Sequence, residues 1–190
     1  PMNTIKIKDK TFAVSIPEDK IQQEVKRVAE EINHDLKDEN PLFLSVLNGS
    51  FMFASDLMRN LTIPCEISFV KLASYTGTSS SGKMKELVGL LEEITGRTVV
   101  IVEDIVDTGF TMQHLLKRLM EQNPKEIRIA TLLVKPDKLQ VELDIQYVAM
   151  HIPNDFIVGY GLDYDGYGRN YRDIYTAVSY THLRAHETLS

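Results

Sequence analysis

Three acidic residues and two threonines lie close together in the segment 103–111. Thr98 to Val102 is a β-branched run typical of a buried parallel strand, and Glu103 and Asp104 follow it directly. Asp107 then opens Asp-Thr-Gly-Phe-Thr, which leads into a helical pattern. Carboxylates are the side chains with which proteins hold Mg²⁺, and the N-terminus of a helix attracts phosphate. The segment therefore predicts a phosphate site beside a divalent cation; the alternative is an acidic strand end with an ordinary helix cap.

This segment resembles the signature with which phosphoribosyltransferases bind 5-phosphoribosyl 1-diphosphate. The signature is a hydrophobic strand, two acids, two apolar residues, Asp-Thr-Gly, one further residue and Thr, and every position is filled here. Further matches resemble the hypoxanthine (6-oxopurine) branch of the type I family, over about residues 4–176. The resemblance implies an enzyme of purine salvage that transfers the 5-phosphoribosyl group to hypoxanthine and guanine and releases pyrophosphate.

Within the signature, the resemblance gives each polar residue a part in the reaction. Glu103 and Asp104 are expected to hold the ribose hydroxyls, directly or through Mg²⁺, the cofactor that the resemblance implies. Asp107 is the expected general base or acid at the purine N7 atom. The residues expected around the 5′-phosphate are Thr108, Gly109, Phe110 and Thr111.

Two loops elsewhere also match the family. Asn48, Gly49 and Ser50 stand in the place of its pyrophosphate-binding loop, whose peptide bond is often cis, although many members carry lysine where this chain has Asn48. Without the resemblance, Asn-Gly at this place would indicate a plain turn. Ser74 and Tyr75, with the Gly/Ser-rich stretch after them, resemble the lid that closes over the reacting atoms and keeps water out.

The residues expected to bind the purine come from two later segments. Lys135 ends an apolar run, and the family places a lysine there against the purine O6; a solvated lysine at a strand end is the alternative. By the same match, Phe156 stacks on the purine and the backbone near Ile157 reads its edge. Asp163 is expected to bind Mg²⁺, and Arg169 to contact pyrophosphate. Without the resemblance, this stretch would indicate an exposed turn with core aromatics.

Three other functions compete with this interpretation. The segment 77–83 fits the first seven positions of a P-loop, but Met84 stands where Ser or Thr must bind Mg²⁺, and the residues after it alternate like a strand. A regulator with the phosphoribosyltransferase fold that binds RNA would need a basic face, and the sequence has no Lys/Arg cluster. A transferase for a pyrimidine, adenine or xanthine would differ from the favoured enzyme in only a few base contacts.

The elements that position these residues alternate between strands and helices. This pattern predicts an α/β fold, a single domain with a mostly parallel twisted sheet flanked by helices, to which the resemblance adds a small base-binding hood. Helices with an apolar stripe are expected from Pro17, from Phe51 and from about Thr111. The expected strands are a hairpin within 3–16 and runs at 42–47, 67–72, 86–91, 98–102, 127–134, 145–150 and about 156–160.

The last fourteen residues, 177–190, differ from the rest of the chain in their residue pattern. They follow neither the helical nor the strand periodicity, and they contain two of the five histidines. The stretch resembles adapter-derived or frame-shifted read-through, with a genuine disordered C-terminus as the alternative. We therefore expect the phosphoribosyltransferase domain to occupy residues 1–176.

The charge balance is acidic, and its distribution matters more than its sum. With 21 Lys and Arg against 27 Asp and Glu, the net charge is -6, which argues against nonspecific binding of nucleic acid. Residues 103–107 and 154–173 together contain seven acidic residues and two arginines, so nearly all of the net charge lies at the expected site. A diphosphate that arrives with Mg²⁺ brings cations, so this acidity is compatible with a phosphate ligand.

Cysteine content and hydropathy indicate where the protein works. The single cysteine, Cys65, excludes an internal disulfide and fits a reducing compartment, so a cytoplasmic location is expected. No run reaches the ~18 apolar residues of a membrane span, and the start of the sequence lacks a signal-peptide core. The expected partners are the small-molecule substrates, without nucleic acid or membrane, and the resemblance implies a homodimer or homotetramer.

Overall fold

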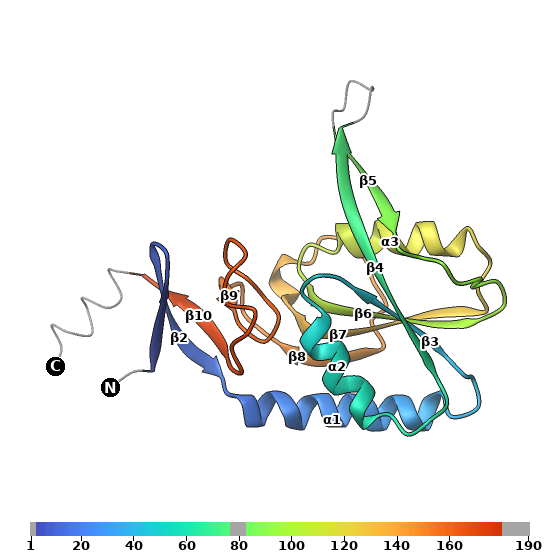
Figure 1. The fold of residues 1–190 in the computed structure, drawn as a ribbon, viewed down its shortest axis with the longest axis horizontal. Helices are drawn as coiled ribbons and strands as arrows, with labels where there is room; N and C mark the ends of the chain where they lie inside the picture. Colours follow the sequence, from blue (N-terminus) through green and yellow to red (C-terminus); the bar gives the residue numbers. More distant parts are fainter. Residues whose placement is uncertain (1–2, 77–82, 180–190) are drawn as a thin grey trace, which may run out of the picture.

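Two sheets of unequal size build the molecule (Figure 1). The computed structural model describes residues 3–76 and 83–179, with the side chains of 74–76 and 83–85 outside that description. The larger sheet has the strand order β5-β4-β3-β6-β7-β8, and the smaller has the order β1-β2-β10-β9. We call the smaller sheet with its connecting turns, residues 4–16 and 156–178, the hood, and the rest the core.

The larger sheet is parallel except at one edge. Strands β4, β3, β6, β7 and β8 pair in parallel, whereas β5 pairs antiparallel with β4. This arrangement confirms the predicted α/β class with a mostly parallel sheet. The bounds are β3 Leu42–Val46, β4 Glu66–Thr76, β5 Lys83–Val88, β6 Thr98–Val106, β7 Glu126–Val134 and β8 Tyr147–His151.

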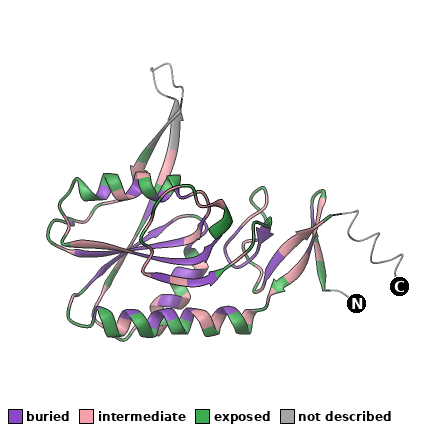
Figure 2. Ribbon diagram, turned by 180° about the vertical axis from the view of Figure 1, so that it is seen from behind, coloured by how far each residue is buried: buried purple, intermediate pink, exposed green. Residues whose placement is uncertain are grey.

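Helices cover both faces of this sheet because its central strands are apolar on both sides. Helix α1 (Glu18–Asp35) and helix α2 (Phe51–Asn60) share one hydrophobic cluster with Val100 and Val102 of β6. Helix α3 (Phe110–Met120) packs on the other face, in the cluster that contains Val99 and Ile101. Alternate residues of one strand thus point to opposite layers. Figure 2 shows the central strands as buried and the outer surfaces of the helices as exposed.

The hood is an antiparallel sheet made from both ends of the described chain. Its strands are β1 Thr4–Ile7, β2 Lys10–Ile16, β9 Ile157–Val158 and β10 Ile174–Val178. The hairpin of β1 and β2 is confirmed, whereas the sequence did not predict β10. Ala177 and Val178 pair with Phe12 and Thr11, so β10 passes the predicted limit at residue 176 by two residues. Residues 180–190 lie outside the described residues, and the division of the chain stays a prediction.

Three predicted strands have different bounds in the structure. Strand β6 continues past residue 102 to Val106 because Ile105 and Val106 still pair with β7, so Glu103 and Asp104 lie on the strand and not after it. Strand β4 extends to Thr76 because it pairs with β5, whose bounds are Lys83–Val88 instead of 86–91. Among the described helices, none is long and apolar enough to cross a membrane.

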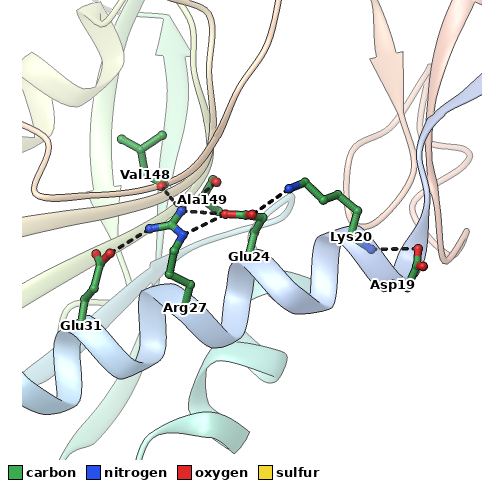
Figure 3. Close-up of polar contacts among 7 residues, drawn as sticks. All are labelled: Asp19, Lys20, Glu24, Arg27, Glu31, Val148 and Ala149. Atoms are coloured by element: carbon green, nitrogen blue, oxygen red, sulfur yellow. Dashed lines mark hydrogen bonds and ion pairs between the residues drawn. The ribbon is translucent and has the colours of Figure 1, made fainter.

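Arg27 ties α1 to the outer edge of the larger sheet (Figure 3). Its Nη2 atom donates to the carbonyl oxygens of Val148 and Ala149 at 2.9 and 3.0 Å. Glu24 and Glu31 hold the guanidinium from the same helix at 2.8 and 2.9 Å. These bonds connect α1 to β8, the edge strand of the larger sheet.

Candidate active site

A cavity of about 340 Å³ opens beside the C-terminal end of β6. In open α/β sheets, ligands bind at the carboxyl ends of the strands. The cavity contains most of the predicted signature. It is lined by Val46, Leu47, Leu72, Glu103, Asp104, Ile105, Val106, Asp107, Thr108, Gly109, Thr111 and Met112.

Glu103 and Asp104 are neighbouring carboxylates in different surroundings. Glu103 is only 8% exposed; burial, and next the charge of Asp104, raises the pKa of the Glu103 carboxyl well above its usual value. Asp104 lies against Gly49 so closely that a Cβ atom there would be 1.8 Å from its Oδ2. The two acids therefore place neighbouring carboxyl groups at one wall of the cavity, and the absence of a side chain at residue 49 makes room for Asp104.

The turn between β6 and α3 has the geometry of an anion site. Gly109 has φ +93°, a conformation that residues with a side chain rarely adopt. The hydroxyl of Thr108 accepts a hydrogen bond from the N–H of Phe110 at 3.4 Å. The first N–H groups of a helix have no acceptors within the helix, and the helix dipole adds partial positive charge there. The turn can therefore hold a phosphate at the floor of the cavity, with Phe110 exposed beside it.

Asp107 lies between the cavity and two lysines that follow β7. Lys135 is only 8% exposed, and its Nζ is 3.9 Å from Oδ2 of Asp107. Lys138 approaches more closely, with Nζ 3.1 Å from Oδ1 and 3.3 Å from Oδ2. The sequence alone does not single out Lys138, because a lysine after Pro136 carries no signal by itself. The structure thus brings Lys135 close to Asp107 and adds Lys138.

The segment expected to bind pyrophosphate lies at the end of β3. The peptide bond between Leu47 and Asn48 is cis, as the resemblance implied. Asn48 is exposed, and Leu47 lines the cavity. Ser50 is fully buried, and its hydroxyl lies 2.6 Å from both the Ser45 hydroxyl and the Val46 carbonyl oxygen. The side chain of Ser50 therefore stabilises the turn from within and does not reach the cavity.

The predicted substrate-binding residues of the segment 156–169 lie in the hood, and none of them lines this cavity. Phe156 is 47% exposed and packs edge-on against Tyr164, with the ring centroids 5.4 Å apart. Ile157 is buried in β9. Arg169 lies 3.3 Å from Asp163 and donates to the carbonyl oxygen of Gly161 at 2.7 Å.

Gly161 connects this part of the hood to the pyrophosphate segment. A Cβ atom at Gly161 would be 2.3 Å from the carbonyl oxygen of Gly49. The backbone of the turn that carries Asp163 and Arg169 is therefore packed directly on the loop before α2. The hood residues and the cavity are neighbours through these two glycines.

Two further expectations concern the lid and the metal. The backbone of Ser74 and Tyr75 lies in β4, paired with Lys85 and Met84; their side chains and residues 77–82 lie outside the described residues. The part of the chain that the structure describes contains no group of three or more metal-ligating side chains. Mg²⁺ often takes only one or two protein carboxylates and completes its shell with water and substrate phosphates, so Glu103 and Asp104 are a sufficient pair.

Comparison with known proteins finds similar sequences that belong to one family. A family model described as a phosphoribosyl transferase domain matches residues 17–165. The hypoxanthine-guanine phosphoribosyltransferase of Mycobacterium tuberculosis is 40% identical over 169 residues, which cover 85% of this chain and 82% of that protein. The enzyme of the same name from Streptococcus pyogenes is 41% identical over 158 residues, covering 83% and 86%.

Solved structures agree with the sequence comparison. A hypoxanthine-guanine phosphoribosyltransferase from Bacillus anthracis, with HEPES in its active site, superposes with a TM-score of 0.79 and 36% identity, covering 87% of this chain and 96% of that one. A hypoxanthine phosphoribosyltransferase from Trypanosoma cruzi, in complex with the product IMP, gives a TM-score of 0.80 and 34% identity, covering 93% and 98%.

Proposed function

This chain belongs to the phosphoribosyltransferase family, in its hypoxanthine-guanine branch, and from that membership we propose that it transfers a 5-phosphoribosyl group to hypoxanthine or guanine. The donor is 5-phosphoribosyl 1-diphosphate, and the products are IMP or GMP and pyrophosphate. One observation carries the proposal: a single cavity contains the paired acids, Asp107 and the phosphate-binding turn 108–111.

The protein has to position the two substrates and stabilise charge in the reaction, because the purine itself supplies the nucleophile. N9 forms a bond to the anomeric carbon of the ribose as the bond from that carbon to pyrophosphate breaks. The turn 108–111 holds the 5′-phosphate, and Glu103 and Asp104 bind the ribose hydroxyls. Fixing the sugar in this way removes much of the entropic cost of bringing two substrates together.

Asp107 is the residue we assign to proton transfer. Its carboxylate faces the cavity beside a buried lysine, so a purine that lies there presents N7 to Asp107 and O6 to Lys135. Asp107 accepts the proton that N7 loses as N9 becomes bonded to the sugar. Phe156 and the backbone at Ile157 are assigned to the face and edge of the base, and Arg169 to pyrophosphate.

The donor set fits Mg²⁺ as the cofactor. Burial, and next the charge of Asp104, raises the pKa of the Glu103 carboxyl, and a divalent cation held by Glu103 and Asp104 would favour the charged form of both acids. When bound, Mg²⁺ supplies charge neutralisation for the diphosphate leaving group. Asp163 is a further candidate ligand, although its carboxylate already contacts Arg169 and the N–H of Gly166.

We also propose that the protein works as a homodimer or homotetramer. Large apolar side chains remain exposed on the described surface, among them Phe51 of α2 and Phe69 of β4. A solved relative from Trypanosoma cruzi was studied for its oligomeric state. Light scattering after size exclusion, at several protein concentrations, measures the mass directly. The cytoplasmic location stays a prediction.

One assay tests the proposed function. The purified protein is incubated with Mg²⁺, 5-phosphoribosyl 1-diphosphate and one base at a time: hypoxanthine, guanine, xanthine, adenine or uracil. We expect pyrophosphate and the nucleoside monophosphate in equal amounts with hypoxanthine and guanine. No product with any base would contradict the enzyme assignment, and product with adenine or uracil alone would contradict the base assignment.

A further inference from the structure

Lys138 contacts the carboxylate of Asp107, and the reaction as proposed gives this lysine no task. Its Nζ is 3.1 Å from Oδ1 and 3.3 Å from Oδ2. We infer that Lys138 is a positioning residue, which contacts both oxygens of the Asp107 carboxylate and so orients that carboxylate toward the purine N7. This inference rests on the proposed function, because it assigns to Lys138 a part in the same reaction.

The two oxygens of Asp107 have different surroundings. Lys138 donates a hydrogen bond to Oδ2. Oδ1 is buried and accepts no hydrogen bond from any residue that the structure describes, since the Lys138 ammonium lies near it without the geometry of such a bond. A buried oxygen of this kind is unavailable to a ligand, so the nearby ammonium of Lys138 is what stabilises its charge. The side chain as a whole is 38% exposed, so its accessible side can accept a hydrogen bond from the N7–H group of a 6-oxopurine.

The backbone holds Lys138 in place independently of its side chain. Residues Pro136–Lys138 form the short 3₁₀ helix η1, and the N–H of Lys138 donates to the carbonyl oxygen of Lys135 at 3.1 Å. Immediately after it, the N–H of Gln140 donates to the carbonyl oxygen of Thr108 at 2.9 Å. The segment that carries Lys138 is thus hydrogen-bonded to the turn that follows Asp107.

Apolar packing strengthens this connection. A Cβ atom at Gly109 would lie 2.6, 3.0 and 3.1 Å from side-chain atoms of Val141, Leu139 and Leu143. Segment 136–143 therefore lies against the phosphate-binding turn at several points. A lysine on such a segment is preorganised to orient a carboxylate on the turn, because neither partner has to be ordered when substrate binds.

The two lysines have separable tasks. Lys135 is buried, and its Nζ is farther from Asp107 than that of Lys138. When Lys135 donates to the purine O6, Lys138 remains as the cation that contacts Asp107. Lys138 therefore keeps the carboxylate oriented through the stage at which the proton moves.

An ordinary surface ion pair is the competing explanation. The side chains of Lys138 and Asp107 are 36% and 38% exposed, and ion pairs of that kind contribute little to stability. Such a pair would affect neither turnover nor substrate binding when Lys138 is replaced. Kinetics therefore separates the two explanations, whereas a measurement of stability does not.

The experiment compares Lys138→Met and Lys138→Arg with the wild-type enzyme, under saturating hypoxanthine and 5-phosphoribosyl 1-diphosphate. We expect Lys138→Met to lower kcat about tenfold while each KM changes less than about twofold, and Lys138→Arg to retain most of the activity. The control is Lys117→Met, which removes an exposed lysine from the last turn of α3, and we expect it to match the wild type. Lys138→Gln repeats the test if Lys138→Met does not fold.

A double substitution identifies the route of the effect. In the Asp107→Asn background, adding Lys138→Met should change kcat less than about twofold, because the residue that Lys138 positions is already inactive. A loss that persists there, or a rise in either KM, would show that Lys138 binds substrate and would overturn the inference. Unchanged kcat in Lys138→Met would overturn it as well. A wild-type protein without turnover would contradict the proposed function and this inference together.

Discussion

At the scale of single residues, the acidic side chains of the site lie in different surroundings. Glu103 and Asp104 place two carboxylates on one wall, where burial and mutual repulsion raise the pKa of Glu103. Asp107 instead lies beside the ammonium groups of Lys135 and Lys138. Glu103 and Asp104 are thus suited to binding the sugar and a cation, and Asp107 is suited to accepting a proton.

Replacing Asp107 by Asn tests the assignment of proton transfer. The amide has nearly the same shape but is a poor base, so we expect kcat to fall by ~10²–10⁴-fold. The KM for 5-phosphoribosyl 1-diphosphate should change little, because the phosphate turn and the paired acids remain. Steady-state kinetics with hypoxanthine gives both values, and unchanged turnover would remove Asp107 from the catalytic step.

Replacing Lys135 by Ala tests the assignment to the base. We expect the KM for hypoxanthine to rise about tenfold or more, as for loss of a hydrogen bond from a charged donor, with a smaller change for the sugar substrate. Lys125→Ala is the matched control, because Lys125 lies just before the opposite end of β7 and pairs with Glu39 on the surface. The reverse pattern, with the sugar KM raised more, would contradict the assignment.

At the scale of elements, the turn from β6 to α3 connects the larger sheet to the functional residues of the cavity. Strand β6, nine residues long, leads to Asp107, and Gly109 in its left-handed conformation starts α3 so that the helix N-terminus faces the cavity. Segment 136–143 packs behind the turn and leaves no space for a side chain at residue 109.

Gly109→Ala should therefore damage both stability and phosphate binding. The left-handed conformation alone costs Ala ~1–2 kcal/mol, and its methyl group would also collide with Val141. Gly96→Ala is the matched control, because Gly96 has φ +73° with open space around it. Denaturant unfolding and the KM for 5-phosphoribosyl 1-diphosphate are measured for both. If the Gly109 variant resembles the Gly96 variant in both quantities, the packing against residue 109 does not matter.

The sequence predicted the elements better than their ends. The apolar stripe of α1 and the β-branched run of β6 are long patterns, and both elements are present. The end of β6 was wrong because its last residues pair with β7 despite the two acids, and pairing of that kind is tertiary. Strand β10 was missed because Ile174–Val178 is short and acquires its pairing partners from β2 and β9, far away in sequence.

Within the site, the sequence was informative where residues are consecutive. The segment 103–111 lies around one cavity because a strand and a turn keep neighbours together. Lys138 was missed because its approach to Asp107 depends on η1 and on the fold around it. Ser50 was predicted to bind substrate as part of the pyrophosphate loop, and that stays a prediction; its hydroxyl donates to the carbonyl oxygen of Val46 within the turn, which no sequence pattern distinguishes.

At the scale of the whole molecule, the hood is attached to the core by few polar contacts. The hydroxyl of Tyr160 donates to Asp56 of α2, and Asp173 accepts from the N–H of Glu18 at 2.7 Å. Burial and the neighbouring Asp56 raise the pKa of the Tyr160 hydroxyl well above its usual value, so it stays protonated and remains a donor. These contacts connect the hood to α1 and α2.

Tyr160→Phe should loosen the hood while the core stays folded. Loss of the donor leaves Asp56 with Gln22 alone, and we expect a cost of ~1–3 kcal/mol with faster amide hydrogen exchange in β9 and β10. Tyr147→Phe removes a similar bond, from Tyr147 to Asp35 at 2.8 Å, far from the hood. Equal exchange in the hood strands of both variants would show that Tyr160 does not anchor the hood.

The most direct test of the account is a crystal structure of this protein with IMP bound. We expect the phosphate oxygens within hydrogen-bond distance of backbone N–H groups in the turn 108–111. A carboxyl oxygen of Asp107, carrying the proton that N7 has lost, should lie about 2.6–3.2 Å from N7 of the purine, with Lys138 still in contact with that carboxyl group and Lys135 on O6. A phosphate bound away from that turn, or a purine whose N7 does not face Asp107, would contradict the account.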